Sequence, residues 1–212
     1  GGSVLMSDKL RSLMAGCERA DSLTWDQHKM MGMPLVCSTI LLRERDLLLR
    51  MNHVGGSDYI FHKTGEQTDL GPMSLQCGRR VDALKLWLAW KCFGRLGFAA
   101  RIENLFALAQ AFAKRLNDHP RFELVAPVAS LNLCFRYVPV GDYSAEEIDR
   151  GNLAARQILL EQGRALINHA VVHDRHVWRL VFANLDLDET AISRIFGEVE
   201  SACTEVFEST SF

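Results

Sequence analysis

The chain has 212 residues, of which 48% are hydrophobic and 24% are charged. This composition is typical of a globular protein with an apolar core and excludes an intrinsically disordered chain. Lys and Arg together number 24 and Asp and Glu number 26, which gives a formal net charge of −2. A balance so close to zero disfavours sequence-independent nucleic-acid binding, which requires a basic excess. No apolar run reaches the ~18 residues of a membrane span, so we expect no membrane association.

Six cysteines are spread along the chain, and none forms a Cys-x-x-Cys pair. A core of this size needs no disulfides, so we expect reduced thiols and a cytoplasmic protein. The first residues show no charged segment followed by an apolar one, and hence no secretory signal. The cysteines are Cys17, Cys37, Cys77, Cys92, Cys134 and Cys203.

The first 80 residues predict short elements joined by loops. Pro34 excludes a helix through Met33, because the residue before proline avoids the α region. Glycines are frequent between residues 52 and 74, which predicts a long loop, and loops of such length are uncommon unless they are functional. The expected elements are a short helix from Ser7 to about Gly16, a buried strand at 21–25, a strand at 36–42 and the loop at 52–74.

From Arg80 onward the pattern is helical at first and then alternates with strands. Phe98, Ile102 and Leu105 recur at spacings of three and four, as in an amphipathic helix. Ser144 and Glu147 match a capping box, which predicts a helix start. The expected order α-β-β-α-β-β-α is typical of a compact α+β layer. The elements are a helix from near Val81, helices at about 97–117, 144–167 and from 188 to the C-terminus, and strands near 121–126, 131–138, 169–173 and 176–183.

Lys29 is the first candidate for chemistry. Most lysines are solvated surface charges, but Lys29 lies among Trp25, three methionines and Pro34, directly after a predicted strand. An apolar setting disfavours the ammonium form and makes the neutral amine available as a nucleophile toward a carbonyl. A Schiff base with pyridoxal phosphate requires such an amine.

Two longer motifs are much more specific than the lysine alone. They are Ala-Asp-Ser-Leu-Thr-Trp-Asp-Gln-His-Lys at 20–29 and Ser-Leu-Gln-Cys-Gly-Arg-Arg-Val-Asp at 74–82. Both resemble the group II pyridoxal-phosphate-dependent amino-acid decarboxylases, especially the glutamate and cysteine-sulfinate decarboxylases. Weaker similarity continues from 132–137 to 179–181, so the resemblance extends over essentially the whole chain. The family usually has Pro before His-Lys, where this chain has Gln27.

The resemblance implies an α/β fold that forms the C-terminal half of a fold type I enzyme. Residues 1–96 would form the C-terminal portion of the large cofactor-binding domain, and residues 97–212 a small α+β C-terminal domain. Gly1 and Gly2 match the end of the family's Asp-Ala-Ala-x-Gly-Gly pattern, whose aspartate pairs with the pyridine nitrogen of the cofactor. We therefore expect the N-terminal half of the same enzyme as a partner, in a homodimer or a dimer of split halves.

The resemblance also assigns roles around the cofactor. Lys29 would form the internal aldimine, and His28 and Asp26 would lie near the phosphate. Gly78 would reach the phosphate bound in the neighbouring subunit, although a glycine at a helix entry explains it equally well. Tyr59 would protonate the carbanion left after CO₂ departs, while its loop excludes water; alternatively, its ring anchors the loop.

Arg179 lies within an apolar predicted strand, where a charge is costly unless it is paired. One interpretation is a buried ion pair with Asp186 or a neighbouring glutamate. The resemblance instead places Arg179 where the family binds the substrate carboxylate, which suits the fork of a guanidinium. His169 and His173 on one strand would lie more than ~13 Å apart, so we expect no metal site.

The sequence thus predicts the C-terminal half of a pyridoxal-phosphate-dependent carboxy-lyase. The expected reaction releases CO₂ from the α-carboxylate of a short acidic L-amino acid, such as glutamate, aspartate or cysteine sulfinate. Two alternatives stay open. One is a related pyridoxal-phosphate enzyme with a different outcome, such as amine oxidation, which Tyr rather than Phe at position 59 disfavours. The other is a non-catalytic fragment or a split-enzyme subunit.

Overall fold

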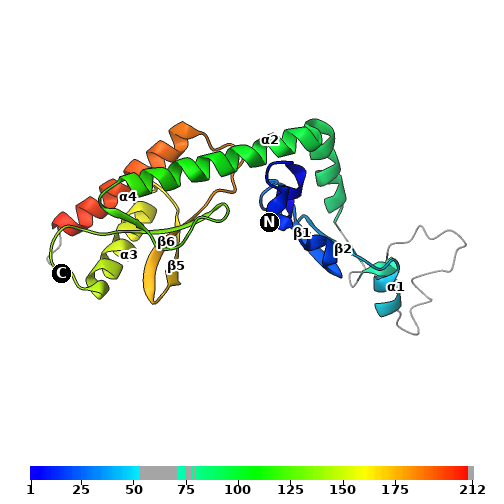
Figure 1. The fold of residues 1–212 in the computed structure, drawn as a ribbon, viewed down its shortest axis with the longest axis horizontal. Helices are drawn as coiled ribbons and strands as arrows, with labels where there is room; N and C mark the ends of the chain where they lie inside the picture. Colours follow the sequence, from blue (N-terminus) through cyan, green and yellow to red (C-terminus); the bar gives the residue numbers. More distant parts are fainter. Residues whose placement is uncertain (53–70, 75–77, 79, 210–212) are drawn as a thin grey trace, which may run out of the picture. The chain divides into compact units, whose positions relative to one another are not determined.

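A computed structural model describes residues 1–52, 71–74, 78 and 80–209. The chain divides into two compact units, Gly1–Ala99 and Ala100–Phe212. Helix α2 (Asp82–Asp118) runs from the first unit into the second and is interrupted at Gly94, whose φ of 60° and ψ of −178° are not helical (Figure 1). Only glycine adopts this backbone readily, so the two helices expected near 81 and 97 are the two arms of α2. The division expected at residues 96 and 97, as one between two enzyme domains, stays a prediction.

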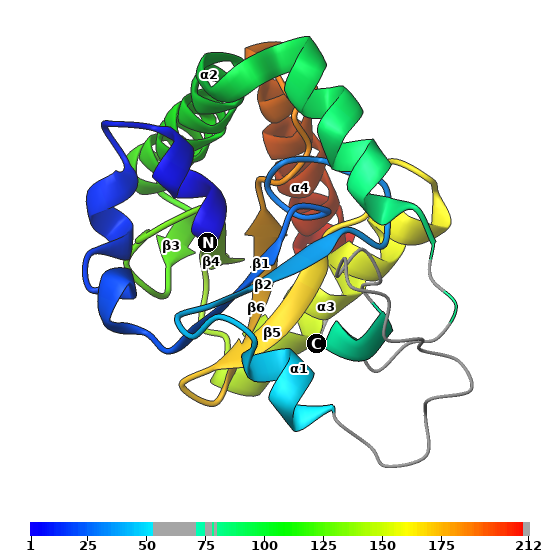
Figure 2. The same ribbon diagram turned by 90° about the vertical axis from the view of Figure 1, so that its right-hand side faces the viewer.

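The first unit is built from short elements and a two-stranded antiparallel sheet (Figure 2). Strand β1 (Ser22–Asp26) pairs with β2 (Ser38–Leu42), with Asp26 opposite Ser38. Both strands were expected, but β1 is only partly buried, because one neighbouring strand covers little of a strand's surface. The other elements are the 3₁₀ helices η1 (Gly2–Met6), η2 (Arg11–Met14), η3 (Cys17–Arg19) and η4 (Gly71–Met73) and the helix α1 (Leu47–Met51).

The helix expected from Ser7 to Gly16 is wrong in type, because this segment forms turns and the short 3₁₀ helix η2. The Ser7 hydroxyl accepts a hydrogen bond from the backbone N–H of Lys9 at 3.2 Å. Such a bond offers the backbone an alternative to the α-helical pattern. Gly16, with φ 95°, then turns the chain into η3.

The first residues of the chain pack against Trp25. A Cβ on Gly2 would come within 3.1 Å of the indole ring, so a glycine lets the backbone approach it. The indole Nε1 donates to Ser3 Oγ at 2.9 Å. Ser3 and Val4 are buried, so these residues are an integral part of the unit.

The second unit contains a four-stranded antiparallel sheet of order β3-β4-β6-β5. The expected order of helices and strands is confirmed. Phe112 of α2 packs against the rings of Phe135, Phe182 and Phe196, with centroids 5.7–5.9 Å apart. The elements are β3 (Phe122–Leu124), β4 (Asn132–Tyr137), α3 (Ala145–Glu161), β5 (Asn168–Val172), β6 (Arg175–Val181) and α4 (Glu189–Ser209). No helix within the described ranges is long and apolar enough to cross a membrane.

Helix α3 begins at the capping box that the sequence predicts. The Ser144 hydroxyl accepts from the Glu147 N–H, and the Glu147 carboxylate accepts from the Ser144 N–H at 2.7 Å. The hydrogen bonds that the Ser144 N–H and then the Ser144 hydroxyl donate to the Glu147 carboxylate lower its pKa. The helix ends at Glu161 rather than near residue 167, because Gly163, with φ 64°, reverses the chain and directs the following amides back to the Leu159 carbonyl.

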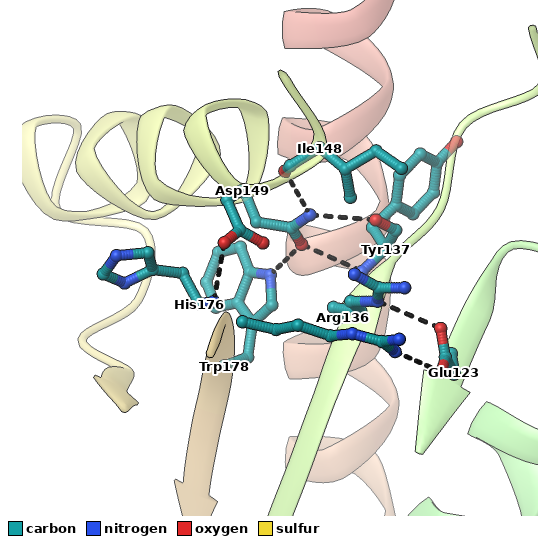
Figure 3. A network of polar contacts seen from close by, with 9 residues as sticks. Glu123, Arg136, Tyr137, Ile148, Asp149, His176 and Trp178 are labelled. Atoms are coloured by element: carbon teal, nitrogen blue, oxygen red, sulfur yellow. Dashed lines mark hydrogen bonds and ion pairs between the residues drawn. The ribbon is translucent and has the colours of Figure 1, made fainter. Parts of the chain in front are cut away.

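A buried amide joins α3 to the sheet. Asn152 is 3% exposed, and its Nδ2 donates to the carbonyls of Tyr137 and Ile148, each at 2.8 Å. Its Oδ1 accepts from the Tyr137 N–H at 2.9 Å and from Trp178 Nε1 at 2.7 Å (Figure 3). Strand β4 pairs with β6 only as far as Phe135 opposite Trp178. Asn152 therefore supplies the hydrogen bonds that a strand residue would give to Tyr137.

We expect Asn152→Ala to lower the free energy of unfolding by about 2–4 kcal/mol, because it leaves several buried polar groups without a partner. Urea unfolding measures the change. Asn117→Ala, at an exposed position of α2, is the control and should change stability by less than about 0.5 kcal/mol. Equal stability of the two variants would contradict the role of the amide.

Candidate active site

Lys29 lies in the loop that connects β1 to β2. Backbone hydrogen bonds fold the loop into tight turns, from Lys29 N–H to the Asp26 carbonyl at 3.2 Å and from Gly32 N–H to the Lys29 carbonyl at 3.0 Å. The Met33 N–H returns to the Gln27 carbonyl at 3.2 Å. The loop thus has a defined shape at the end of a strand.

The structure corrects the expected surroundings of the Lys29 amine. The neighbouring Met30, Met31 and Met33 are buried, whereas the Lys29 side chain is 67% exposed. Its Nζ lies 2.7 Å from Asp26 Oδ2. The apolar residues therefore anchor the loop, and the loop presents the amine to solvent beside a carboxylate.

Asp26 is held by Ser38 of β2 and by Lys29 of the loop. Ser38 Oγ donates to Asp26 Oδ1 at 2.7 Å, across the pair that closes the sheet. The hydrogen bond with Lys29, and next the one with Ser38, lower the pKa of Asp26. Ser38 was not among the predicted site residues. Its place beside Asp26 follows from the register of β1 and β2, which the sequence alone does not give.

His28 is fixed against the start of β2. Its Nδ1 lies 2.9 Å from the Cys37 carbonyl and 3.3 Å from Ser38 Oγ. Gln27, which stands where the family usually has Pro, is 2% exposed, and its side-chain amide lies 2.8 Å from Thr39 Oγ1. The turn before His28 is therefore fixed by a buried hydrogen bond instead of a proline ring. Burial raises the pKa of the nearby Cys37 thiol.

Lys85, in the first turn of α2, holds the far side of the loop. Its Nζ donates to the carbonyls of Val36 at 2.8 Å and Pro34 at 3.2 Å, and lies 2.6 Å from Asp82 Oδ1. The sequence motif around residue 85 indicated similarity but not this contact. Asp82 and Lys85 are three residues apart, and this spacing in a helix could have predicted their ion pair.

Gly78 and Tyr59 are two other residues predicted to belong to the site. Gly78 is exposed, and a Cβ on it would meet nothing within 4 Å, so space alone does not require a glycine. Its role toward a phosphate stays a prediction. Tyr59 lies outside the described residues, and its role also stays a prediction.

Arg179 lies on β6 in the second unit, opposite Cys134 of β4 and Asn168 of β5. The neighbouring Trp178 points to the face of the sheet that carries α3, where its Nε1 donates to Asn152. Because side chains alternate along a strand, Arg179 points to the opposite face. Over the residues that the structure describes, its guanidinium forms no ion pair, with Asp186 or with any glutamate. Arg136, in contrast, pairs with Glu123 at 3.0 Å (Figure 3), and Arg175 lies 3.4 Å from the same carboxylate. Arg179 is thus a half-buried cation without an ion pair among the described residues.

The histidines have a different arrangement from the one expected. His173 lies in the two-residue turn between β5 and β6, where His173 and Asp174 have φ of 50° and 59°. The His169 and His176 rings are 6.2 Å apart on the paired strands. In the described part of the chain, no group of three or more metal-ligating side chains is arranged to hold an ion.

We expect Lys85→Met to loosen residues 34–36, because it removes two hydrogen bonds from a charged donor. The free energy of local opening should fall by about 1–3 kcal/mol. Amide hydrogen exchange of peptides covering 30–38 measures this. Lys91→Met is the matched control, because Lys91 lies over the Trp87 ring on the same helix. Equal exchange in both variants would rule out the Lys85 contact.

The chain is similar to several known proteins. Residues 1–138 match the pyridoxal-dependent decarboxylase conserved domain. Cysteine sulfinic acid decarboxylase from mouse is 35% identical over 94% of this chain and 43% of its own length. A crystal structure of mouse CSAD in apo form superposes with a TM-score of 0.86 at 34% identity, over 95% of this chain and 44% of the other. Rice TDC with PLP and tryptamine gives a TM-score of 0.86 at 27% identity, over 96% of this chain and 43% of the other.

These likenesses confirm the expected fold, a part of the fold type I decarboxylase fold. The chain spans less than half the length of the relatives it matches. The match to the conserved domain covers more than half of the chain and includes Lys29 in its loop. The chain therefore belongs to the pyridoxal-dependent decarboxylase family.

Proposed function

We propose that this chain contributes the cofactor lysine and the arginine for the substrate carboxylate to a pyridoxal-phosphate-dependent amino-acid decarboxylase. The observation that carries the proposal is the Lys29 loop. It presents an exposed amine on a loop whose ends are fixed by β1, β2 and Lys85. This amine lies within the part of the chain that matches the decarboxylase domain.

The residues of the loop suit the cofactor. Lys29 Nζ is the amine that would hold the cofactor aldehyde, and the fixed imidazole of His28 is the group that would face its phosphate. When bound, pyridoxal phosphate supplies the conjugated ring that takes up the electron pair left when CO₂ departs. The protein's own contribution here is to orient the amine and to fix the imidazole before binding.

Arg179 would bind the α-carboxylate of the substrate. A guanidinium forms two parallel hydrogen bonds to a carboxylate and fixes its orientation. The absence of an ion pair at Arg179 among the described residues supports this role, because the neighbouring Arg136 and Arg175 are both occupied by Glu123. On the sequence resemblance alone, Tyr59 is the proposed proton donor to the substrate carbon.

We propose a short acidic L-amino acid as the substrate. The curated relatives named cysteine sulfinic acid decarboxylase support this, at 34–35% identity over 94% of the chain. Rice TDC, whose structure contains tryptamine, is more distant at 27% identity. The active protein would then be a cytoplasmic enzyme of amino-acid metabolism.

The N-terminal half of the same enzyme is the proposed partner, within a dimer. The fraction of the relatives' length that the chain covers, 43%, supports a missing half. Exposed apolar side chains on the first arm of α2 and at the residue before it support it as well, since surfaces of this kind usually bind protein. They are Val81, Leu84, Trp87 and Leu88. The second candidate function is a subunit that has no activity without this partner. It is favoured by the same observation, that the chain covers 43% of the relatives' length.

We expect the chain, co-expressed with a polypeptide that supplies the preceding part of the decarboxylase fold, to bind pyridoxal phosphate covalently. Visible absorbance of the lysine-bound cofactor and CO₂ release from glutamate, aspartate, cysteine sulfinate and aromatic amino acids are the measurements. Lys29→Ala should abolish the absorbance, because it removes the only proposed amine. Equal absorbance with and without Lys29 would refute the assignment.

We expect Arg179→Met, in the same assembled protein, to raise the KM for the substrate about 10- to 100-fold, since it removes charged hydrogen bonds to a carboxylate. Arg175→Met is the matched control, from the same strand but bound to Glu123. An unchanged KM in Arg179→Met, or an equal rise in Arg175→Met, would contradict the role of Arg179.

A further inference from the structure

We infer that Asp26 is a positioning residue for Lys29 and not a ligand of the cofactor phosphate. Its carboxylate holds the Lys29 amine in an ion pair that must open before the amine reacts with an aldehyde. The inference deepens the proposed function and rests on it only in taking Lys29 as the cofactor lysine.

The first observation is the contact itself. Asp26 Oδ2 and Lys29 Nζ lie 2.7 Å apart. The two residues are three positions apart, and the hydrogen bond from the Lys29 N–H to the Asp26 carbonyl closes the turn between them. The backbone of the loop therefore brings the two side chains to the same side.

The second observation is that the carboxylate is the fixed partner. Asp26 is the last residue of β1, and Ser38 Oγ on β2 holds its other oxygen, Oδ1, at 2.7 Å. The Asp26 side chain is 27% exposed, whereas that of Lys29 is 67% exposed. The sheet thus positions the carboxylate, and the carboxylate positions the more exposed amine.

The third observation is the charge around the pair. His28 lies beside Asp26 in the same loop, with its Nδ1 near Ser38. Asp82 and Lys85, at the start of α2, neutralise each other at 2.6 Å. The nearby Cys37 thiol is buried, and burial raises its pKa, so it carries no charge at neutral pH. Lys29 is therefore the principal cation that faces Asp26.

This arrangement is unsuited to binding a phosphate through Asp26. The hydrogen bonds with Lys29 and Ser38 lower the pKa of Asp26, so it is ionised at neutral pH. An ionised carboxylate only accepts hydrogen bonds, and it repels a phosphate dianion. His28 remains the residue of this motif that suits a phosphate.

The pair has a chemical consequence for Lys29. An ammonium has no free electron pair, so Nζ must leave the carboxylate and release a proton to solvent before it attacks. Its electron pair then forms a bond to the aldehyde carbon, and the aldehyde oxygen leaves as water when the C=N bond forms. Capture of an aldehyde is therefore slower while the pair is closed.

Asp26→Asn tests this, because asparagine has the same shape, still accepts from Ser38 and carries no charge. The full chain is mixed at pH 7 with pyridoxal phosphate or with pyridoxal, which lacks the phosphate. Borohydride then supplies hydride that reduces the C=N bond to a stable amine, and mass spectrometry gives the initial rate of capture at Lys29. We expect the variant to capture both aldehydes about threefold faster, the range for an exposed ion pair.

The two aldehydes separate the possible roles. An equal rise for both supports the ion pair, whereas a rise confined to pyridoxal phosphate would show that Asp26 acts on the phosphate and would overturn the inference. Unchanged rates would overturn it as well. Asp21→Asn is the matched control, because Asp21 immediately precedes β1 and contacts Arg43; it should change neither rate. Ser38→Ala, which keeps the charge but releases the carboxylate, should give a smaller rise.

A second readout needs no cofactor site. Acetic anhydride acetylates neutral amines, with acetate as the leaving group, and the extent at Lys29 relative to Lys114 is measured in the same digest. Asp26→Asn should raise this ratio about threefold. If Lys29 of the protein assembled with its N-terminal half captures neither aldehyde, the proposed function fails. The acetylation ratio still decides the ion pair, because an unchanged ratio refutes it.

Discussion

The pairing of β1 with β2 is the constraint on which the candidate site depends. It sets Asp26 opposite Ser38 and closes a loop of eleven residues between them. The His28 ring and the buried Gln27 amide are each held by a group on β2 or directly before it. The Lys29 amine is held by Asp26, whose carboxylate accepts from Ser38 of β2. A lysine with no apolar shell of its own thus acquires a defined place, because a strand pair orients its neighbours.

The second unit uses polar side chains for a related purpose. Where β4 and β6 separate, Asn152 and Asp149 of α3 bind the backbone groups of Tyr137 and His176 that have lost a strand partner. The cost of burying those groups without partners is several kcal/mol, so α3 completes the sheet as well as covering it. Arg179 lies on the opposite face, where Arg136 and Arg175 share one carboxylate and Arg179 has none among the described residues.

Local patterns predicted most of the fold. The capping box at Ser144 and the periodicity through Phe112 depend on residues close in sequence, and both are confirmed. The helix predicted from Ser7 was wrong, because a hydrogen bond to the Ser7 side chain competes with the α-helical pattern. The residues that hold the Lys29 loop were harder to predict, because Ser38 depends on register and Lys85 is 49 residues from the Val36 carbonyl that it binds. The family resemblance identified Lys29, but it did not predict that the lysine side chain is exposed while the neighbouring methionines are buried.

The amide of Asn152 also specifies how the sheet is aligned. Successive residues of a strand direct their N–H and C=O groups to alternate sides, so a slip of β4 by one residue would direct those of Tyr137 away from α3. Asn152 would then lose two of its four hydrogen bonds while still buried, because those to the Tyr137 backbone come from β4, whereas the others come from Trp178 of β6 and Ile148 of its own helix. A single side chain thereby discriminates against misaligned sheets, and the position of Arg179 relative to its neighbours on β4 depends on that discrimination.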